Sequence, residues 1–245
     1  MNRSNPALST ARYEDAARAA AGAEAMTVGG AAGKALLLLA LLGLSVGYTW
    51  YQLGTGAIQN PRTLLIASII AALIVAMVGI FKPRTTPWIA PIYAVIEGMA
   101  LAVISVYTNA AYPGLPLLAV GLTVCVTLVM LILYTTRVLQ ATPAMWRMVT
   151  IATGGIFVFY LVSFALSFTG FRMPLIHSGG PLGIAFSLFV VGLAAFNLVL
   201  DFSVIEEGAK MRAPKYMEWY GAFGLLITLV WLYIELLRLL RKVQR

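Results

Sequence analysis

The sequence predicts an all-α, polytopic membrane protein, a bundle of seven transmembrane helices. Seven apolar runs of 18 to 20 residues fill most of the 245-residue chain, and a helix needs roughly 20 apolar residues to cross a bilayer core of about 30 Å. Apolar residues make up 61% of the chain and charged residues 11%, whereas soluble domains carry roughly 25% charged residues. Because backbone groups in lipid must be hydrogen-bonded within helices, one compact bundle is expected.

The expected spans follow one another with short connections. They are residues 35–53, 64–81, 89–107, 117–134, 149–168, 182–200 and 222–240. Pro91 is expected in the first turn of the third span, where its missing N–H costs little. A tight Pro-Gly-Leu-Pro turn at 113–116 precedes the fourth span. Pro181 begins the sixth helix, and Gly208 is the expected cap at its end.

Polar tails flank this bundle. Residues 1–34 are Ala-rich and hold three acidic side chains, unlike a signal peptide, which starts with basic residues and a short apolar region. We therefore expect a retained tail. Residues 13–25 are compatible with a loose helix, which Gly29, Gly30 and Gly33 would end before the first span. Residues 241–245 form a short basic C-terminal tail.

The chain has 17 Lys and Arg against 9 Asp and Glu, a formal net charge of +8. We do not expect nucleic-acid binding, because these cations lie at span ends, where they set topology and meet anionic lipid headgroups. With a cytoplasmic N-terminus, 11 cations lie on the cytoplasmic side and 6 on the other. The positive-inside rule favours this orientation. The basic C-terminal end departs from the rule, so the side of the C-terminus stays open.

Three acidic residues lie in or beside the apolar runs: Glu97, Asp201 and Glu235. A carboxylate inside a membrane is costly, so it should face the bundle interior or a water-filled cavity, and burial disfavours its charged form. Glu97 and Asp201 could meet as a proton-sensitive pair or as a weak site for a hard cation such as Ca²⁺. The alternatives are a packing hydrogen bond for Glu97, and for Asp201 an interfacial ion pair with Lys210 or Arg147.

Glu235 and the acidic residues of the loop before the last span favour ordinary surface roles. Glu235 lies three residues before Arg238, and this spacing favours an ion pair at the membrane interface. Glu206, Glu207 and Glu218 share a cation-rich loop and are expected to be solvated.

The predicted spans lack the histidine and lysine side chains that several classes of membrane protein need. Cys125 permits no disulfide within the chain and is expected to be a small buried packing residue. His177 lies in a loop, and one histidine builds neither a multi-histidine zinc site nor an intramembrane serine–histidine pair. The five lysines lie at span ends or in loops, which excludes a retinal Schiff base. We expect no enzyme.

Gly43 and Gly47 form a small-xxx-small pair, which we expect to let helices pack closely within the bundle.

Six segments carry a resemblance to a known family. They are AMTVGG at 25–30, PIYAVIEG at 91–98, ATGG at 152–155, GPLGI at 180–184, NLVLDF at 197–202 and APKYMEWY at 213–220. Because these segments occur in this order along seven spans, the chain resembles the Bax inhibitor family, which is also called the transmembrane Bax inhibitor motif family. Within that family it resembles the bacterial branch. The resemblance implies a bundle with the last helix near its centre, a location in the bacterial inner membrane, and a pH-dependent calcium leak.

The resemblance also implies that two aspartates control the leak through their protonation. Asp201 falls on the first position, late in the sixth helix, but Thr228 stands where the second aspartate belongs. Threonine can hydrogen-bond to a carboxyl but cannot share its charge. Glu97 could supply the second carboxyl. Glu235 is the other candidate, because it lies two turns after Thr228 on the same face, although roughly 10 Å farther along the helix.

We therefore expect a pH-sensitive cation leak channel, most simply for Ca²⁺, that is gated by buried carboxyls. Asp201 is its expected titrating group, Glu97 its candidate partner and second metal ligand, and Thr228 a polar neighbour. The alternative is a non-conducting regulatory protein that binds membrane proteases or other membrane partners, which the polar tail and the missing second aspartate favour. No resident cofactor is expected beyond transient Ca²⁺.

Overall fold

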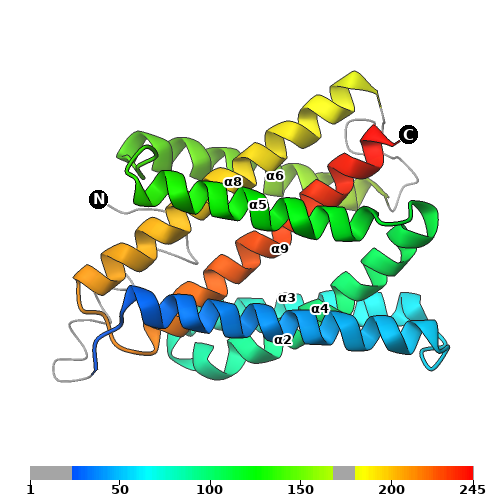
Figure 1. Cartoon of the computed structure of the whole chain (residues 1–245), viewed down its shortest axis with the longest axis horizontal. Coiled ribbons are helices and arrows are strands. Elements are labelled where there is room, and N and C mark those ends of the chain that lie inside the picture. Colours follow the sequence, from blue (N-terminus) through cyan, green and yellow to red (C-terminus); the bar gives the residue numbers. More distant parts are fainter. Residues whose placement is uncertain (1–23, 168–179, 245) are drawn as a thin grey trace. The chain divides into compact units, whose positions relative to one another are not determined.

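The computed structural model describes residues 24–167 and 180–244 (Figure 1). This part of the chain contains seven helices that are long and apolar enough to cross a membrane. They are α2 (Val28–Gly54), α3 (Pro61–Phe81), α4 (Thr86–Ala111), α5 (Leu115–Thr135), α6 (Pro143–Ser167), α8 (Pro181–Lys210) and α9 (Met217–Val243). A single 3-10 turn, η1 (Pro83–Thr85), precedes α4. The predicted all-α polytopic fold is confirmed.

The described chain forms two compact units. Unit 1 holds residues 24–113 and 204–227, and unit 2 holds residues 114–167, 180–203 and 228–244. Helices α2, α3 and α4 belong to unit 1, and α5 and α6 to unit 2. The helices α8 and α9 each run through both units, and α9 is the most buried of the seven spans.

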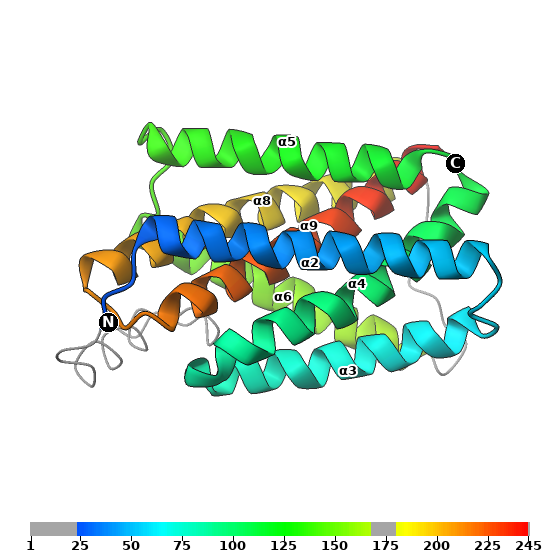
Figure 2. The same ribbon diagram turned by 60° about the horizontal axis from the view of Figure 1, so that its bottom comes forward.

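In unit 1, α4 packs against both α2 and α3 (Figure 2). The first turns of α9 complete this core, where Phe223 meets Tyr93 of α4 edge to face with ring centroids 5.2 Å apart. The helices α2 and α4 lie close together at Gly98, where an added Cβ would lie 2.7 Å from Ser45 Cβ. The Ser45 hydroxyl donates to the Val95 carbonyl oxygen at 2.6 Å, so a hydrogen bond accompanies the close approach.

The first helix begins earlier than predicted, at Val28, so residues 28–34 belong to the helix rather than to the tail. Thr27 is its N-cap, because the Thr27 hydroxyl accepts a hydrogen bond from the Gly30 N–H at 2.9 Å. The expectation that Gly29, Gly30 and Gly33 end a helix here is wrong. A cap at Thr27 and an apolar continuation outweigh the low helix propensity of three glycines. The predicted helix at 13–25 lies almost wholly outside the described residues.

Two other boundaries also differ from the prediction. Helix α4 begins at Thr86 with Pro87 in its first turn, so Pro91 lies inside the helix rather than at its start. Helix α8 continues past Gly208 to Lys210, and the left-handed residue after it is Arg212, with φ 54°. The turn predicted at 113–116 is present, with Gly114 at φ 81° directly before α5.

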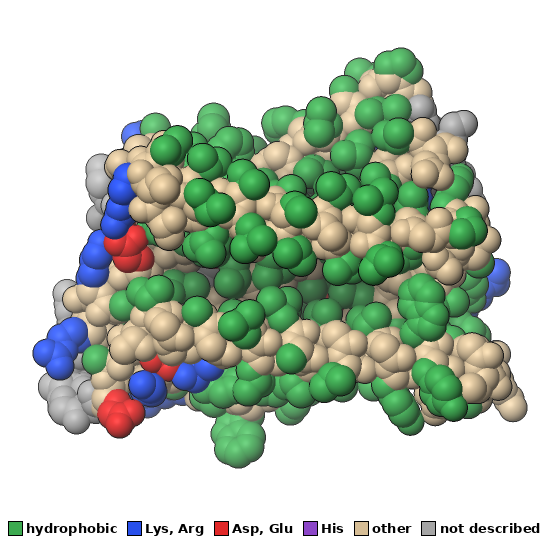
Figure 3. Space-filling view, viewed as in Figure 1, with side chains coloured by type: hydrophobic (Ala, Val, Ile, Leu, Met, Phe, Trp, Pro, Cys, Tyr) green, Lys and Arg blue, Asp and Glu red, His purple; other side chains and the backbone are tan. Residues whose placement is uncertain are grey.

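Apolar side chains cover the faces of α2 and α5 that are visible in Figure 3, as lipid-facing helices require. Cys125 of α5 is exposed on such a surface, so the expectation that it is buried is wrong. Nothing lies within 4 Å of a Cβ placed at Gly43 or Gly47. Within unit 1, the predicted packing role of this pair is therefore wrong.

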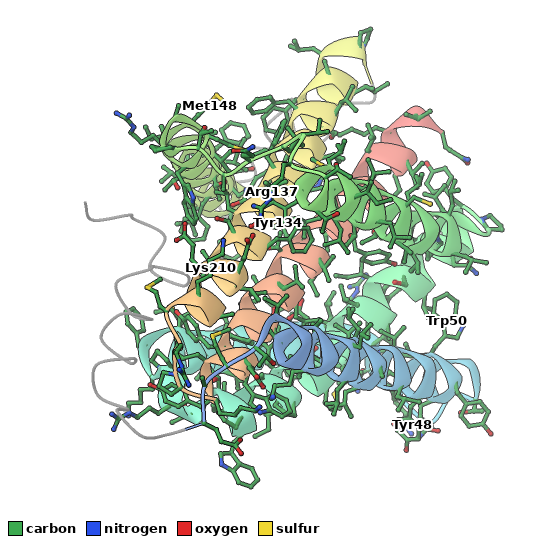
Figure 4. All side chains as sticks on the ribbon, turned by 60° about the vertical axis from the view of Figure 1, so that its left-hand side comes forward. Tyr48, Trp50, Tyr134, Arg137, Met148 and Lys210 are labelled. Carbon is green, nitrogen blue, oxygen red and sulfur yellow. The ribbon has the colours of Figure 1, made fainter. Side chains whose placement is uncertain are left out.

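Polar and aromatic side chains gather near the helix ends, as at membrane–water interfaces. Tyr48 and Trp50 project near the C-terminal end of α2 (Figure 4). At the C-terminal end of α5, the guanidinium carbon of Arg137 lies 5.8 Å from the centroid of the Tyr134 ring. Lys210, at the end of α8, pairs with Glu206 at 2.6 Å.

Candidate functional site

Asp201 lies inside α8, nine residues before the last residue of that helix, or about 14 Å along the axis. Only 3% of its surface is exposed. The Thr228 side chain, on α9, hydrogen-bonds to the Asp201 carboxyl. The Asp201 Oδ2 atom is buried and has no hydrogen-bond partner among the described residues. Asp201 is thus a buried carboxyl held by a neutral hydroxyl, which leaves one oxygen available for a proton or a cation.

The ion pair that the interfacial alternative gives to Asp201 is not seen among the described residues. Lys210 pairs with Glu206 on its own helix, and the Arg147 Nε donates to the Pro143 carbonyl oxygen at 3.4 Å. The buried Oδ2 atom of Asp201 has no hydrogen-bond partner among the described residues.

Asn197, one turn before Asp201 on α8, extends this polar cluster. Its Nδ2 donates to the Thr153 hydroxyl of α6 at 2.9 Å and to the Leu193 carbonyl oxygen at 2.9 Å. Because a carbonyl can only accept, these bonds fix which side of the amide carries nitrogen. Thr153, Asn197, Asp201 and Thr228 therefore bring polar groups of three helices together inside unit 2. Sequence reasoning gave Asn197 no role, although its spacing of four residues from Asp201 was the available signal.

Glu97 lies on α4 in unit 1 and is partly buried. Its side chain hydrogen-bonds to the Tyr93 side chain one turn earlier. Asp201 and Glu97 belong to different units, so their pairing stays a prediction.

Glu235 is buried, with 1% of its surface exposed. The predicted ion pair with Arg238 is present at 2.9 Å, with the carboxylate buried and the Arg238 side chain 23% exposed. The Glu235 Oε1 atom also accepts from the Tyr160 hydroxyl at 2.9 Å and from Trp231 Nε1 at 3.3 Å. Arg238 also donates to the Tyr160 hydroxyl, and its guanidinium carbon lies 4.8 Å from the centroid of the Tyr160 ring. With three donors already bound to its carboxylate, Glu235 is a less available acceptor than Asp201.

Glu218 differs most from its prediction, since it was expected to be solvated and is fully buried. Its carboxylate accepts hydrogen bonds from Thr27 and forms an ion pair with Lys34 of α2. The only sequence signals were an acidic residue in the first turn of the last span and a lysine at the start of the first.

The described residues contain no group of three or more His, Cys, Asp or Glu side chains that could together hold a metal ion. A hard cation at Asp201 would therefore draw its other ligands from hydroxyl, amide or backbone oxygens and from water. His177 lies outside the described residues.

The comparisons with known proteins agree with this architecture. A family model described as Bax inhibitor 1 like matches residues 5–245, a range that includes all seven described spans. No curated protein and no solved structure matches the chain. The match therefore covers every described transmembrane helix. This multi-pass membrane protein therefore belongs to the Bax inhibitor 1 like family.

Proposed function

We propose that the protein is a pH-sensitive leak pathway for hard cations, most simply Ca²⁺, with Asp201 as the group that takes up and releases the proton. One observation carries the proposal: Asp201 is buried within an apolar helix, and its Oδ2 atom lacks a partner among the described residues. An ionisable side chain inside a membrane is expensive and marks ion pathways or proton relays. A purely structural carboxyl would be expected to have both oxygens bonded, as Glu235 has.

The neighbours of Asp201 suggest how protonation changes the helix contacts. The charged carboxylate only accepts hydrogen bonds, and the Thr228 hydroxyl can donate to it. A protonated carboxyl also donates, and Thr228 can then accept. The contact between α8 and α9 thus changes its hydrogen-bond direction when Asp201 binds a proton, while cation binding requires the charged form.

Polar groups along the C-terminal half of α9 support an ion path that leads from Asp201 toward that end of the helix. Thr228, Glu235 and Lys242 recur every seven residues, which places them on one helix face about 10 Å apart. All three are buried. The Lys242 Nζ donates to the Gly183 carbonyl oxygen of α8 at 2.9 Å. These groups interrupt the apolar interior along this half of α9, and the carboxylate of Glu235 is already neutralised there by Arg238.

A second candidate function is a non-conducting regulatory protein that binds membrane proteases or other membrane partners. One observation favours it: the position beside Asp201 is a threonine, so this cluster holds a single titratable group. One carboxyl can sense a proton, but it repels no second carboxyl when it loses that proton.

The test is Ca²⁺ flux from proteoliposomes that contain the purified protein, between about pH 5 and 8. We expect flux that changes with pH in the wild type and flux without that pH dependence in Asp201→Asn. Glu206→Gln is the matched control, because it neutralises a carboxyl that pairs with Lys210 on its own helix. No flux above empty liposomes at any pH would refute the leak pathway and favour the regulatory function.

We also propose that the protein lies in the bacterial inner membrane with its N-terminus in the cytoplasm, as the distribution of cations between the two sides favours. Reporter fusions to the N-terminus and to each connection test this orientation. A periplasmic N-terminus would refute it.

A further inference from the structure

Glu218, the second residue of α9, has none of its surface exposed. Its Oε1 atom accepts hydrogen bonds from the Thr27 backbone N–H at 2.9 Å and from the Thr27 hydroxyl at 3.1 Å. Its Oε2 atom forms an ion pair with Lys34 of α2, and Lys215 lies 3.5 Å from Oε1. A buried carboxylate is tolerated only when it is paired and hydrogen-bonded. Apart from Lys215, these partners come from the N-terminal end of the described chain.

The segment just before α2 also contacts the connection between α8 and α9 (Figures 1 and 2). The Met26 N–H donates to the Ala213 carbonyl oxygen at 2.6 Å, and the Lys215 N–H donates to the Glu24 carbonyl oxygen at 2.9 Å. Between these bonds, Ala25 faces Pro214 in an antiparallel bridge. Proline has no N–H to donate, which suits the non-hydrogen-bonded position of such a pair.

This bridge has too few hydrogen bonds to be stable alone, because even a complete two-stranded hairpin is marginal in water. The buried Met26 side chain provides an apolar anchor, and Glu218 provides the polar one. Gly30 lets the carboxylate lie directly against α2, since a Cβ at this position would overlap the Glu218 side chain. One carboxylate thus joins residues 24–27, the start of α2 and the first turn of α9.

We propose that residues 24–27 form a releasable latch on α9, with Glu218 as its positioning residue, and that releasing the latch raises ion flux at the Asp201 site. α9 is one continuous helix, and it carries Thr228 ten residues after Glu218, about 15 Å along the axis. A latch on the first turn restrains the rotation and sliding of the helix that hydrogen-bonds to Asp201. The effect of the latch on ion flux rests on the proposed function, whereas the latch itself does not.

Release of the latch is measured without any flux. Ala25→Cys is introduced into a Cys125→Ser background, and its reaction with a water-soluble maleimide is timed in detergent and in liposomes. We expect Glu218→Gln to speed labelling roughly 5- to 30-fold, as the loss of a contact worth one or two kcal/mol would. Glu206→Gln is the matched control and should leave the rate unchanged. Thr27→Val, which keeps the ion pair with Lys34, tests the latch if Glu218→Gln does not fold.

Locking the latch tests its control of flux. A non-hydrogen-bonded antiparallel pair has Cα atoms about 4.5 Å apart, within the range that a disulfide spans. Ala25→Cys with Pro214→Cys should therefore crosslink on oxidation. We expect Ca²⁺ flux at fixed pH to be lowest in the oxidised protein, to recover on reduction, and to be highest in Glu218→Gln.

The two measurements separate the possible failures. Equal labelling rates in Ala25→Cys alone and in Ala25→Cys combined with Glu218→Gln or Thr27→Val would overturn the latch. Faster labelling with the same flux in the oxidised and reduced crosslinking variants would overturn its control of flux, even where Asp201→Asn alters the flux. If Asp201→Asn leaves flux unchanged while the crosslink changes it, the latch stands and the proposed role of Asp201 fails.

Discussion

Replacing Gly98 by alanine should force α2 and α4 apart in unit 1. A Cβ at Gly98 would lie 2.7 Å from Ser45 Cβ and 2.8 Å from the Leu42 carbonyl oxygen. Carbon atoms in contact are separated by about 3.5 to 4.0 Å, so α2 must move by roughly 1 Å. The Leu42 oxygen is a backbone atom and cannot rotate away. The same movement stretches the hydrogen bond from Ser45 to the Val95 carbonyl oxygen, which is now 2.6 Å long.

The magnitude follows from three contributions. Overpacking a well-packed contact costs about 1–3 kcal/mol. Losing the Ser45 hydrogen bond costs about 1 kcal/mol. The better helix propensity of alanine returns about 0.5–1 kcal/mol. The expected net loss of stability for Gly98→Ala is therefore about 1–3.5 kcal/mol.

The assay is thermal unfolding of the purified protein in detergent, followed by tryptophan fluorescence. Gly43→Ala is the matched control, because Gly43 lies on α2 in the same unit and nothing is within 4 Å of its added Cβ. We expect a lower Tm for Gly98→Ala and no loss for Gly43→Ala. If the two variants unfold at the same temperature, the close approach of α2 and α4 at Gly98 does not limit stability, and the reasoning is refuted.

Three further substitutions test the polar clusters and the lipid-facing surface. Tyr160→Phe removes a hydroxyl that donates to Glu235 and accepts from Arg238, so we expect a loss of about 1.5–3 kcal/mol in the same unfolding assay; an unchanged Tm would show that the hydroxyl contributes nothing. Asn197→Leu keeps the branching and number of side-chain heavy atoms but removes two hydrogen bonds, and it should cost about 1–3 kcal/mol. A gain in stability would contradict the polar role of the amide. Cys125→Ala changes an exposed residue and should stay within about 0.5 kcal/mol of the wild type, whereas a larger loss would mean that this thiol is buried.

The number of spans and their helical type could be predicted from the sequence alone. A membrane-spanning helix must satisfy its own backbone and be apolar over roughly 20 residues, so span number is visible in local composition. The ends of spans were less predictable, because caps decide them. Thr27 starts α2 ahead of three glycines, and Pro87 rather than Pro91 occupies the first turn of α4.

The candidate site was only partly accessible from the sequence. The charge of Asp201 inside an apolar run identified it as a costly and therefore informative residue, and the resemblance placed Thr228 next to it. Asn197 and Thr153 could not be joined to this cluster, because their contact links residues 44 positions apart.

Glu218 shows most clearly what the tertiary structure decided. From its local sequence it is one acidic residue among several cations, which is typical of a solvated loop. In the fold, Thr27 and Lys34, more than 180 residues away in the chain, surround its carboxylate. Apolar length is a property of each segment by itself and can be read from composition. The partners of a buried charge depend on which helix ends the bundle brings together, and no local pattern records that.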